Sequence, residues 1–516
     1  MFFRWLLIVS LLASRLVGLK WGNGFFFHPD ENNMAWAVGR LSWPNLNPQF
    51  FAYGQFPLYL VYFSYQVLAF VSGSHFFQNI PFSWAVYLLR FWSAFFSIAT
   101  VIVAWLLAKQ IFKKEKWANV YVLLLIFASG LIQIAHFGTT ESIMTFVGLS
   151  LAYFCLKFQE NKKNLFLFFL ALISAIGLAS KLSAALFLFG PLMVLLRSKK
   201  KLLNLFIFGT LTFLLIVFFS PYYLLDFSES WRIFKYESGI ARGSIPVFYT
   251  RQFIKTKPVI FQLTKIFPWT LGLPMFFLLI PSLIFFILNP ASQADRSKFL
   301  ILNSVFLPWL FFNSFLFTKW TRFMTPILPF LVLPVVWFLK EASRKKQKFI
   351  YFLLFLLVIP GVVFMKIYFW PDVRFQASHW MNKNLPKNSV ILSEAGNVVD
   401  LPLFNHQDFK VINFDFYNLD ESSTGQQELM ELIARADYIL LPSRRILADH
   451  IRLPNKFSKT AEFYNQLFSG ELGFDLVKEF RPFFSGAEFF LGSDLDSEET
   501  WTVFDHPTIR LFAKSP

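Results

Sequence analysis

Long apolar runs separated by short polar turns fill the first 369 residues of the chain. A helix that crosses a bilayer needs ~20 predominantly apolar residues. After residue 369 the pattern changes to short apolar stretches between polar segments, so we expect a helical membrane domain at 1–369 and a soluble domain at 370–516. The apolar runs lie at 3–20, 55–72, 84–112, 117–136, 142–158, 164–180, 182–196, 203–225, 266–288, 299–317, 323–339 and 349–369.

Basic residues gather in every second turn between the runs, and such short loops are cytoplasmic by the positive-inside rule. Counting outward from them, 84–112 starts on the outer side, where the first run also ends. The run 55–72 therefore cannot cross, and we expect it to lie along the outer interface. This predicts eleven spans, a cytoplasmic N terminus and an extracytoplasmic C-terminal domain. The basic turns hold Lys113 to Lys116, Lys162-Lys163, Arg197 to Lys201, Arg296 to Lys298 and Arg344 to Lys348.

Two outer loops are long. The first, 21–83, is expected to contain interfacial helices near 30–41 and 56–71, and loops of this length without their own fold are usually functional. The second, 226–265, carries seven basic residues against three acidic ones. That charge fits an anionic substrate or anionic lipid headgroups.

Strand-like and helix-like stretches alternate in residues 370–516, which predicts a small α/β domain. This part contains neither a Gly-rich phosphate loop nor metal-ligand spacing. Its four histidines, His379, His406, His450 and His506, are expected to be scattered on the surface. Strands are expected at 389–393, 411–416, 438–442, 476–480 and 509–513, and helices at 374–384, 426–436 and roughly 459–470.

The composition agrees with a polytopic membrane protein, since 56% of the 516 residues are hydrophobic and 20% are aromatic. Residues 370–516 carry a net charge of −7, which leaves +24 for residues 1–369. Membrane orientation explains basic short loops, so no nucleic-acid partner is predicted. The single cysteine, Cys155, excludes an intramolecular disulfide.

Residues 1–369 contain ten Asp or Glu, and two of them, Asp30 and Glu31, directly follow the first run. An acidic residue beside a bilayer is energetically costly and requires a reason. Asp30 could be a general base, or Pro29-Asp30-Glu31 could begin an interfacial helix whose dipole favours carboxylates. The two interpretations are compatible. Glu141, at an outer turn between two runs, is likewise either a functional carboxylate or part of the first turn of a helix.

Three cations lie at the outer ends of apolar runs: Arg90, Lys181 and Arg322. Each of these side chains could simply extend its charged end to the lipid headgroups. Together with the carboxylates they suit sugar transfer from a lipid phosphate. A carboxylate accepts the proton of the attacking hydroxyl, and cations stabilise the departing phosphate. Such a leaving group needs no second carboxylic acid, unlike glycoside hydrolysis.

The order of short motifs resembles the GT-C glycosyltransferases of the protein O-mannosyltransferase and aminoarabinose transferase type. The resemblance covers essentially the whole membrane part. It runs through Pro29-Asp30-Glu31, Tyr53-Gly54-Gln55-Phe56-Pro57-Leu58-Tyr59, Leu89-Arg90-Phe91, Thr139-Thr140-Glu141, Gly177 to Lys181, and Arg322-Phe323 with Pro326 and Pro329.

The resemblance implies a GT-C membrane fold and a polyprenyl-phosphate-linked sugar donor. It also implies inverting, mannosyltransferase-like hexosyl transfer on the outer face of the cell membrane, in glycosylation of the cell envelope. Asp30 would be the base, with Glu31 and Glu141 as further site carboxylates. Arg90, Lys181 and Arg322 would bind the donor phosphate, and His28, Tyr53 and Gln55 would line the substrate loop.

Three positions depart from the family pattern. Glu141 stands where an Asp is usual, and Gln55 and Asn33 stand where the aminoarabinose transferases have Lys and Arg. These departures argue against aminoarabinose as the donor and bring Arg251 and Lys255 into the predicted phosphate site. Two C-terminal segments resemble those of uncharacterised prokaryotic members of this family. They are Ala377-Ser378-His379-Trp380 and Val503-Phe504-Asp505-His506-Pro507.

A transporter or flippase of lipid-linked sugars is the alternative. Transporters place ionisable groups at mid-membrane, often in paired halves, whereas here these groups lie at the outer ends and no repeat is visible. In a third interpretation the protein is non-catalytic and its carboxylates only cap helices. No cofactor or metal is expected, although Asp30, Glu31 and Glu141 could bind one divalent cation. The sugar and the acceptor, which could be a glycan, a lipid or a protein, stay open.

Overall fold

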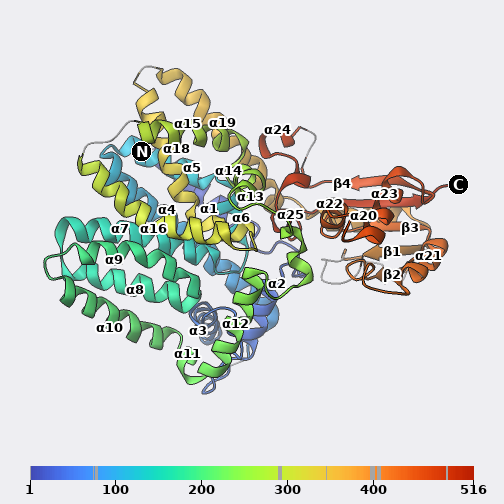
Figure 1. The fold of residues 1–516 in the computed structure, drawn as a ribbon, viewed down its shortest axis with the longest axis horizontal. Coiled ribbons are helices and arrows are strands. Elements are labelled where there is room, and N and C mark those ends of the chain that lie inside the picture. The colour runs from blue at the N-terminus through green and yellow to red at the C-terminus, as the bar shows by residue number, and fades with distance from the viewer. Residues whose placement is uncertain are drawn as a thin grey trace. The chain divides into compact units, whose positions relative to one another are not determined.

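The computed structural model describes residues 2–73, 75, 79–288, 293–344, 346–394, 401–403, 408–483 and 486–516. The chain divides into two compact units. The first comprises Met1–Lys20, His28–Ile245 and Lys257–Met365, and the second comprises Trp21–Phe27, Pro246–Thr256 and Lys366–Pro516. Helices build the first unit, and a small sheet with helices builds the second (Figure 1).

The first unit is helical, and proline often stands in the first turn of its helices, where no intrahelical hydrogen bond is lost. Its helices are α1 (Phe2–Leu16), α2 (Pro29–Gly39), α3 (Phe56–Val71), α4 (Phe82–Phe112), α5 (Glu115–Ile126), α6 (Ser129–His136), α7 (Glu141–Asn161), α8 (Asn164–Ser180), α9 (Phe189–Leu196), α10 (Lys201–Phe219), α11 (Tyr222–Leu225), α12 (Phe227–Arg242), α13 (Ile260–Lys265), α14 (Phe267–Leu271), α15 (Leu273–Leu288), α16 (Gln293–Phe315), α17 (Thr321–Met324), α18 (Leu328–Ala342) and α19 (Gln347–Phe369), with 3-10 helices at Leu182–Leu188 and Thr325–Ile327.

Among the described residues, six helices are long and apolar enough to cross a membrane, or seven if α5 and α6 form one span. These two helices meet at 59°, because Ala128 between them has an extended backbone. Four further apolar segments are shorter: α3, α8, Leu182–Leu196 and α15. The predicted apolar runs are therefore helical, but length and composition support fewer spans than the eleven predicted.

The helices of the first unit differ in burial in the way expected of a bundle in lipid. Within an 18-residue window, 78% of α7 is buried inside the protein but only 11% of α10. Helix α4 packs on α7, and α10 packs on α8, with α10 at the edge of the bundle in Figure 1. The apolar side chains that α10 exposes suit contact with lipid tails rather than water.

The second unit is built on a mixed sheet, which confirms the predicted C-terminal α/β domain. The described strands have the order β2-β1-β3-β5-β4. Strand β1 pairs in parallel with β2 and β3, and β5 pairs antiparallel with β3 and β4. The strands are β1 (Val390–Glu394), β2 (Lys410–Phe414), β3 (Tyr438–Leu441), β4 (Phe474–Phe480) and β5 (Ile509–Lys514).

Helices cover both faces of this sheet. Because successive residues of a strand point to opposite faces, Leu392 packs in the cluster that includes Leu429 of α21 and Phe463 of α23. Its neighbour Ile391 packs instead with residues of α20, such as Ala377. The helices of this unit are α20 (Val373–Asn384), α21 (Gly425–Arg435), α22 (Leu447–Arg452), α23 (Ser458–Ser469), α24 (Glu488–Leu491) and α25 (Glu499–Thr502).

Two segments from the membrane part of the sequence belong to this second unit. The Arg374 guanidinium of α20 lies 4.1 Å from the ring centroid of Phe27, a cation–π distance. Arg452 of α22 donates hydrogen bonds of 3.0 Å to the carbonyl oxygens of Gln252 and Ile254. Local sequence patterns gave no sign of this recruitment.

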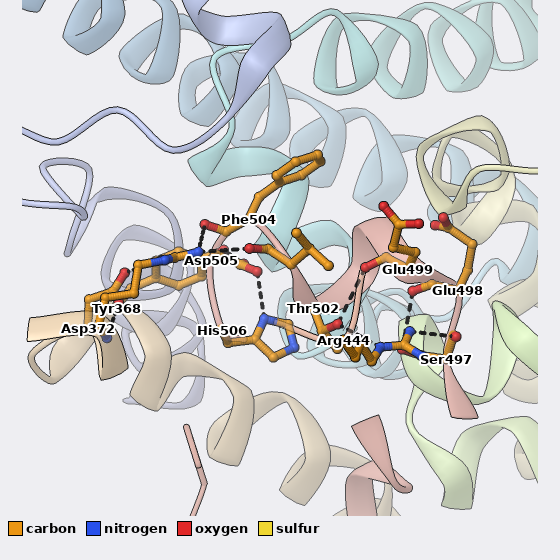
Figure 2. Close-up of polar contacts among 12 residues, drawn as sticks. Tyr368, Asp372, Arg444, Ser497, Glu498, Glu499, Thr502, Phe504, Asp505 and His506 are labelled. Atoms are coloured by element: carbon orange, nitrogen blue, oxygen red, sulfur yellow. Dashed lines mark hydrogen bonds and ion pairs between the residues drawn. The ribbon is translucent and has the colours of Figure 1, made fainter. Parts of the chain in front are cut away.

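The prediction of surface histidines is wrong for two of the four. His450 and His506 are fully buried, while His379 is exposed and His406 lies outside the described residues. His506 Nδ1 lies 2.6 Å from Asp505 Oδ1, and Asp505 Oδ2 accepts a 2.6 Å hydrogen bond from Tyr368 (Figure 2). Each buried ring has a polar partner at Nδ1 inside the domain, since His450 Nδ1 lies 2.9 Å from the Ile446 carbonyl oxygen and His506 Nδ1 faces Asp505.

Candidate active site

Helix α2 presents two adjacent carboxylates at its positive end. His28 precedes the helix with an extended backbone, Pro29 opens the first turn, and Asp30 and Glu31 follow in that turn. The helix dipole stabilises negative charge at this end. The predicted helix start is therefore present, and both carboxylates are also engaged by cations from distant parts of the chain.

Glu31 forms a buried ion pair with Arg90 of α4. The closest approach, between Arg90 Nη2 and Glu31 Oε2, is 2.7 Å, and both side chains are completely buried. Glu31 Oε1 also accepts a 2.6 Å hydrogen bond from the Gly138 amide, and Arg90 Nη1 donates to the Leu19 carbonyl oxygen at 3.1 Å. This network fixes α2 against α4 and the turn before α7.

Asp30 points to a different cation. Its carboxylate pairs with Arg322 of α17, and both side chains remain about a quarter exposed (23% for Asp30, 24% for Arg322). The Arg322 guanidinium also lies 4.8 Å from the ring centroid of Trp320. Asp30 is thus the partly accessible member of the carboxylate pair, while Glu31 is sealed in the interior.

Lys181 connects three further segments of the first unit. It follows α8 with an extended backbone, and its ammonium lies 3.0 Å from Glu141 Oε1. The same ammonium lies 5.5 Å from the ring centroid of Tyr53 and 5.1 Å from that of Phe323. Phe323 and Arg322 are neighbours on the short helix α17. The Lys181 ammonium therefore lies beside the helix that carries Arg322.

The predicted substrate-loop residues lie beside these pairs. The His28 ring lies 4.6 Å from the Phe137 ring. Burial, together with the charges of Arg322 and Arg90, lowers the pKa of His28 well below its usual value, so its imidazole is neutral. Gln55, just before α3, accepts a 2.7 Å hydrogen bond from the Ser220 hydroxyl.

Arg251 and Lys255 belong to the second unit. Arg251 donates to the Tyr417 carbonyl oxygen, and its Nη2 lies 2.8 Å from Glu421 Oε1. Lys255 is exposed, and its own backbone has a positive φ. Their assignment to a donor phosphate stays a prediction, and Arg251 has carboxylate and carbonyl partners inside the C-terminal domain.

Glu237 of α12 is a carboxylate on which the charge of Lys181 acts, and the sequence motifs did not single it out. The Lys181 ammonium is close enough to lower the pKa of Glu237, although partial burial outweighs it and raises that pKa. The sequence offered a signal, because Glu237 is one of few carboxylates in residues 1–369. The loop 226–265, which contains Glu237, was singled out for its excess of basic residues instead.

Within the described ranges, no three His, Cys, Asp or Glu side chains lie close enough together to hold a metal ion. The described carboxylates of the site face Arg or Lys side chains instead. Metal independence stays a prediction.

The second unit contains its own cluster of polar side chains, and their hydrogen-bond partners belong mainly to the same unit (Figure 2). Arg444, after β3, donates to the carbonyl oxygens of Leu495 and Ser497, each at 2.7 Å. Arg374 donates to the carbonyl oxygens of Val503 and Phe504, each at 2.8 Å. These buried guanidinium groups hold the 495–506 segment on the domain, so we assign them a structural role.

Comparison with known proteins agrees with this architecture. Residues 82–224 match the family described as dolichyl-phosphate-mannose-protein mannosyltransferase. No curated protein matches the chain in sequence.

Two solved proteins are similar to this chain in structure. One is the oligosaccharyltransferase of Archaeoglobus fulgidus, which was solved in the apo form and in complex with zinc and sulfate. Its zinc and sulfate complex aligns with a TM-score of 0.50 and 12% identity over 89% of this chain and 70% of its own. The apo ArnT of Cupriavidus metallidurans aligns with a TM-score of 0.46 and 14% identity, over 88% of this chain and 94% of its own. The family model matches only a part of the chain, and the likeness to the oligosaccharyltransferase, at 12% identity, shows a similar fold.

Proposed function

We propose that the protein transfers a sugar from a polyprenyl-phosphate carrier to an acceptor hydroxyl on the extracytoplasmic face, with Asp30 as the general base. The observation that carries this proposal is the contrast between adjacent carboxylates. Glu31 is fully buried, whereas the Asp30 side chain is 23% exposed beside Arg322. A general base must reach the proton that it removes, and Asp30 meets that requirement where Glu31 does not.

The chemistry follows from the charges of the site. Asp30 accepts the proton of the acceptor hydroxyl, whose oxygen attacks the anomeric carbon of the sugar from the side opposite the phosphate. The bond between that carbon and the phosphate oxygen breaks, its electron pair stays on the phosphate, and the anomeric configuration inverts. Arg322 and Lys181 stabilise the added negative charge.

Arg90 has a different part in this proposal. Its guanidinium is completely buried against Glu31 and the Leu19 carbonyl oxygen. A donor phosphate would have to displace a buried ion pair to reach it, which is unfavourable. We therefore assign Arg90 and Glu31 to positioning α2, so that Asp30 and Arg322 face the substrate together.

The family description supports a lipid-linked donor, because it names a dolichyl-phosphate-linked mannose. The basic turns support an outer position for the loops that carry the site. Hexose transfer, the face of the membrane and independence from metal ions are parts of this proposal. The acceptor is an open choice among glycan, lipid and protein hydroxyls.

A transfer assay with full-length protein in lipid nanodiscs tests the proposal. A panel of radiolabelled polyprenyl-phosphate hexoses would be supplied with a cell-envelope extract as acceptor, with and without EDTA. We expect the wild type to consume one donor equally in both conditions, Asp30→Asn to lose at least a hundredfold in rate, and the control Glu229→Gln to behave as wild type. Glu229 is an exposed carboxylate paired with Arg232 on α12.

An Asp30→Asn variant as active as wild type would exclude Asp30 as the base. Labelled lipid that crosses the bilayer without being consumed would replace the transferase with a flippase. Loss of activity in EDTA that returns with a divalent cation would contradict metal independence.

A further inference from the structure

Two cations of the candidate site approach one aromatic ring, that of Phe323. The Lys181 ammonium lies 5.1 Å from the Phe323 ring centroid, and the Arg322 guanidinium lies 5.8 Å from it. Both distances are within the range of a cation–π interaction, in which the negative face of the ring attracts a positive charge. Lys181 follows α8 and Arg322 belongs to α17, so the ring connects cations from distant parts of the chain.

Each cation also approaches a second ring. The Lys181 ammonium lies 5.5 Å from the ring centroid of Tyr53, and the Arg322 guanidinium lies 4.8 Å from that of Trp320. The Trp320 and Phe323 rings meet edge to face, with their centroids 5.2 Å apart. Phe323 is therefore the ring that the two cations share.

The backbone of Phe323 is fixed independently of these cations. Its carbonyl oxygen accepts a 2.7 Å hydrogen bond from the Trp309 indole of α16. The Trp309 ring is buried and stacks on Phe187, with centroids 4.4 Å apart. The preceding carbonyl oxygen, that of Arg322, accepts a 3.0 Å hydrogen bond from the Thr325 hydroxyl. The Phe323 ring thus has the rigid support that a group which positions other groups requires.

An uncharged ring supplies something that the carboxylates of the site do not. Arg322 pairs with Asp30, which loses its charge when it accepts a proton in the proposed reaction. Lys181 pairs with Glu141, whose carboxylate competes with a phosphate for the same ammonium. The Phe323 ring attracts both cations without neutralising their charge, so they stay in place and remain able to bind a phosphate.

We propose that Phe323 is a positioning residue that holds Lys181 and Arg322 together for the phosphate of the lipid-linked donor. The inference rests on the proposed function, in which these two cations stabilise that phosphate. Phe323 acts through the cations and contacts none of the reacting atoms. Its effect should therefore be the same for a lipid phosphate with a sugar and for one without.

Two lipids and three variants separate this role from others. Full-length wild type, Phe323→Leu, Phe323→Tyr and Phe306→Leu would be compared in nanodiscs. Leucine stays apolar but removes the ring face, whereas tyrosine keeps it. Phe306→Leu is the matched control, because the Phe306 ring is also partly buried and stacks on Phe330 of α18, with centroids 5.3 Å apart.

The ligands are polyprenyl phosphate and the polyprenyl-phosphate hexose that the wild type consumes. Their affinities would be measured by displacement of a labelled lipid phosphate, and folding by the melting temperature. Loss of cation–π attraction corresponds to roughly a three- to thirtyfold loss in affinity. We expect that loss in Phe323→Leu for both lipids, and affinities close to those of the wild type in Phe323→Tyr and Phe306→Leu.

Three results would overturn the positioning role. A loss confined to the sugar-bearing lipid would show that the Phe323 ring contacts the sugar. Unchanged affinity of Phe323→Leu for both lipids would show that the cations need no shared ring. An equal loss in Phe306→Leu would show that any partly buried ring of the helical unit has the same effect.

A double-mutant cycle tests whether Phe323 acts through Lys181. In the Lys181→Met background, Phe323→Leu should weaken the binding of polyprenyl phosphate less than it does in the wild type, because one of the two cations is already absent. An equal effect in both backgrounds would refute the inference. Phe323→Met takes the place of the leucine variant in this cycle if the leucine variant does not fold.

The proposed function fails by a different observation. A wild type that binds polyprenyl phosphate but consumes no sugar-bearing lipid would refute the transferase, and the effect of Phe323→Leu on phosphate binding would still be measured. A wild type that consumes a donor while Phe323→Leu matches it in affinity for both lipids would refute the role of Phe323 alone.

Discussion

Neighbouring residues of α2 have opposite environments because successive side chains of a helix point about 100° apart. That rotation sends Glu31 into the interior against Arg90 and leaves Asp30 partly exposed beside Arg322. A buried ion pair holds its position strongly, since removal of one partner leaves the other charged and desolvated. A partly exposed pair exchanges partners more easily, as a base and a phosphate ligand must do during a reaction.

Glu31→Gln should destabilise the protein by about 3–5 kcal/mol, because it leaves the buried Arg90 guanidinium without a counter-charge. Asp30→Asn should change stability by under about 1 kcal/mol, because its pair is partly solvated. The melting temperatures and folded yields of the two variants in detergent would test this difference. The double variant Glu31→Gln/Arg90→Met should regain part of the loss, and equal melting temperatures for both single variants would contradict the assignment.

Glu394, at the end of β1, provides a prediction for the pH dependence of stability. Burial raises its pKa to about 8, although a hydrogen bond from Tyr464 and the charge of Arg510 act in the opposite direction. The folded state therefore keeps a proton that the unfolded state releases above its usual pKa of about 4.3. The free energy of unfolding should fall as pH rises between these two values and level off above the upper one.

Glu394→Gln removes this proton linkage while keeping the shape of the side chain. The melting temperature of full-length wild type should decrease relative to that of Glu394→Gln as the pH is raised from 5 to 8. Parallel melting curves for the two proteins across this range would show that Glu394 is already ionised in the folded state.

At the scale of elements, close backbone approach decides which segments form the site. The Gly54 amide donates to the Ser180 carbonyl oxygen, and a Cβ at residue 54 would lie 1.9 Å from the Ala179 carbonyl oxygen. Only glycine permits this approach. It brings the segment before α3 against the end of α8, where Lys181 follows.

Gly54→Ala should separate these two segments and displace Lys181 from the site. We expect a fall in transfer rate of about a hundredfold, since a shift of 1 Å in a catalytic group can have that effect. Gly209→Ala is the matched control, because a Cβ at Gly209 on α10 meets no atom within 4 Å. Donor consumption by the two variants would test this, and an active Gly54→Ala would show that the approach is not required.

The whole molecule combines a helical unit rich in apolar helices with a unit built on a mixed sheet, and the second also takes in Trp21–Phe27 and Pro246–Thr256. These two segments flank parts of the first unit that hold the candidate site, because Trp21–Phe27 leads directly into α2 and Pro246–Thr256 follows α12. The chain therefore passes between the units several times. The positive-inside pattern predicts that the second unit is extracytoplasmic.

Cysteine labelling in intact cells tests this orientation. The native Cys155 is buried, so single cysteines introduced at exposed positions give a readable signal. Ser469→Cys in the C-terminal domain should react with a membrane-impermeant maleimide, whereas Lys163→Cys between α7 and α8 should react only after permeabilisation. The reverse pattern would invert the topology and move the candidate site to the cytoplasmic face.

Much of the fold followed from local patterns. The C-terminal strands and the helices α20, α21 and α23 were predicted to within a few residues, because alternation of apolar residues and turn signals are local properties. The short helices α22, α24 and α25 were not predicted. The predicted helices near 30–41 and 56–71 are α2 and α3, although their position at the interface stays a prediction. The number of spans was harder to predict from the sequence, because a bend such as that between α5 and α6 depends on how the helices pack.

The sequence alone identified the carboxylates and cations of the candidate site, since charged residues are rare in an apolar chain and each requires a reason. It could not pair them. Asp30 meets Arg322, Glu31 meets Arg90 and Glu141 meets Lys181, and each partner lies tens to hundreds of residues away. Glu237 and the recruitment of Arg251 to the second unit escaped notice for the same reason. Periodicity and turn residues act over a few positions and specify elements, whereas the pairing of charges depends on how distant helices pack, which only the folded chain decides.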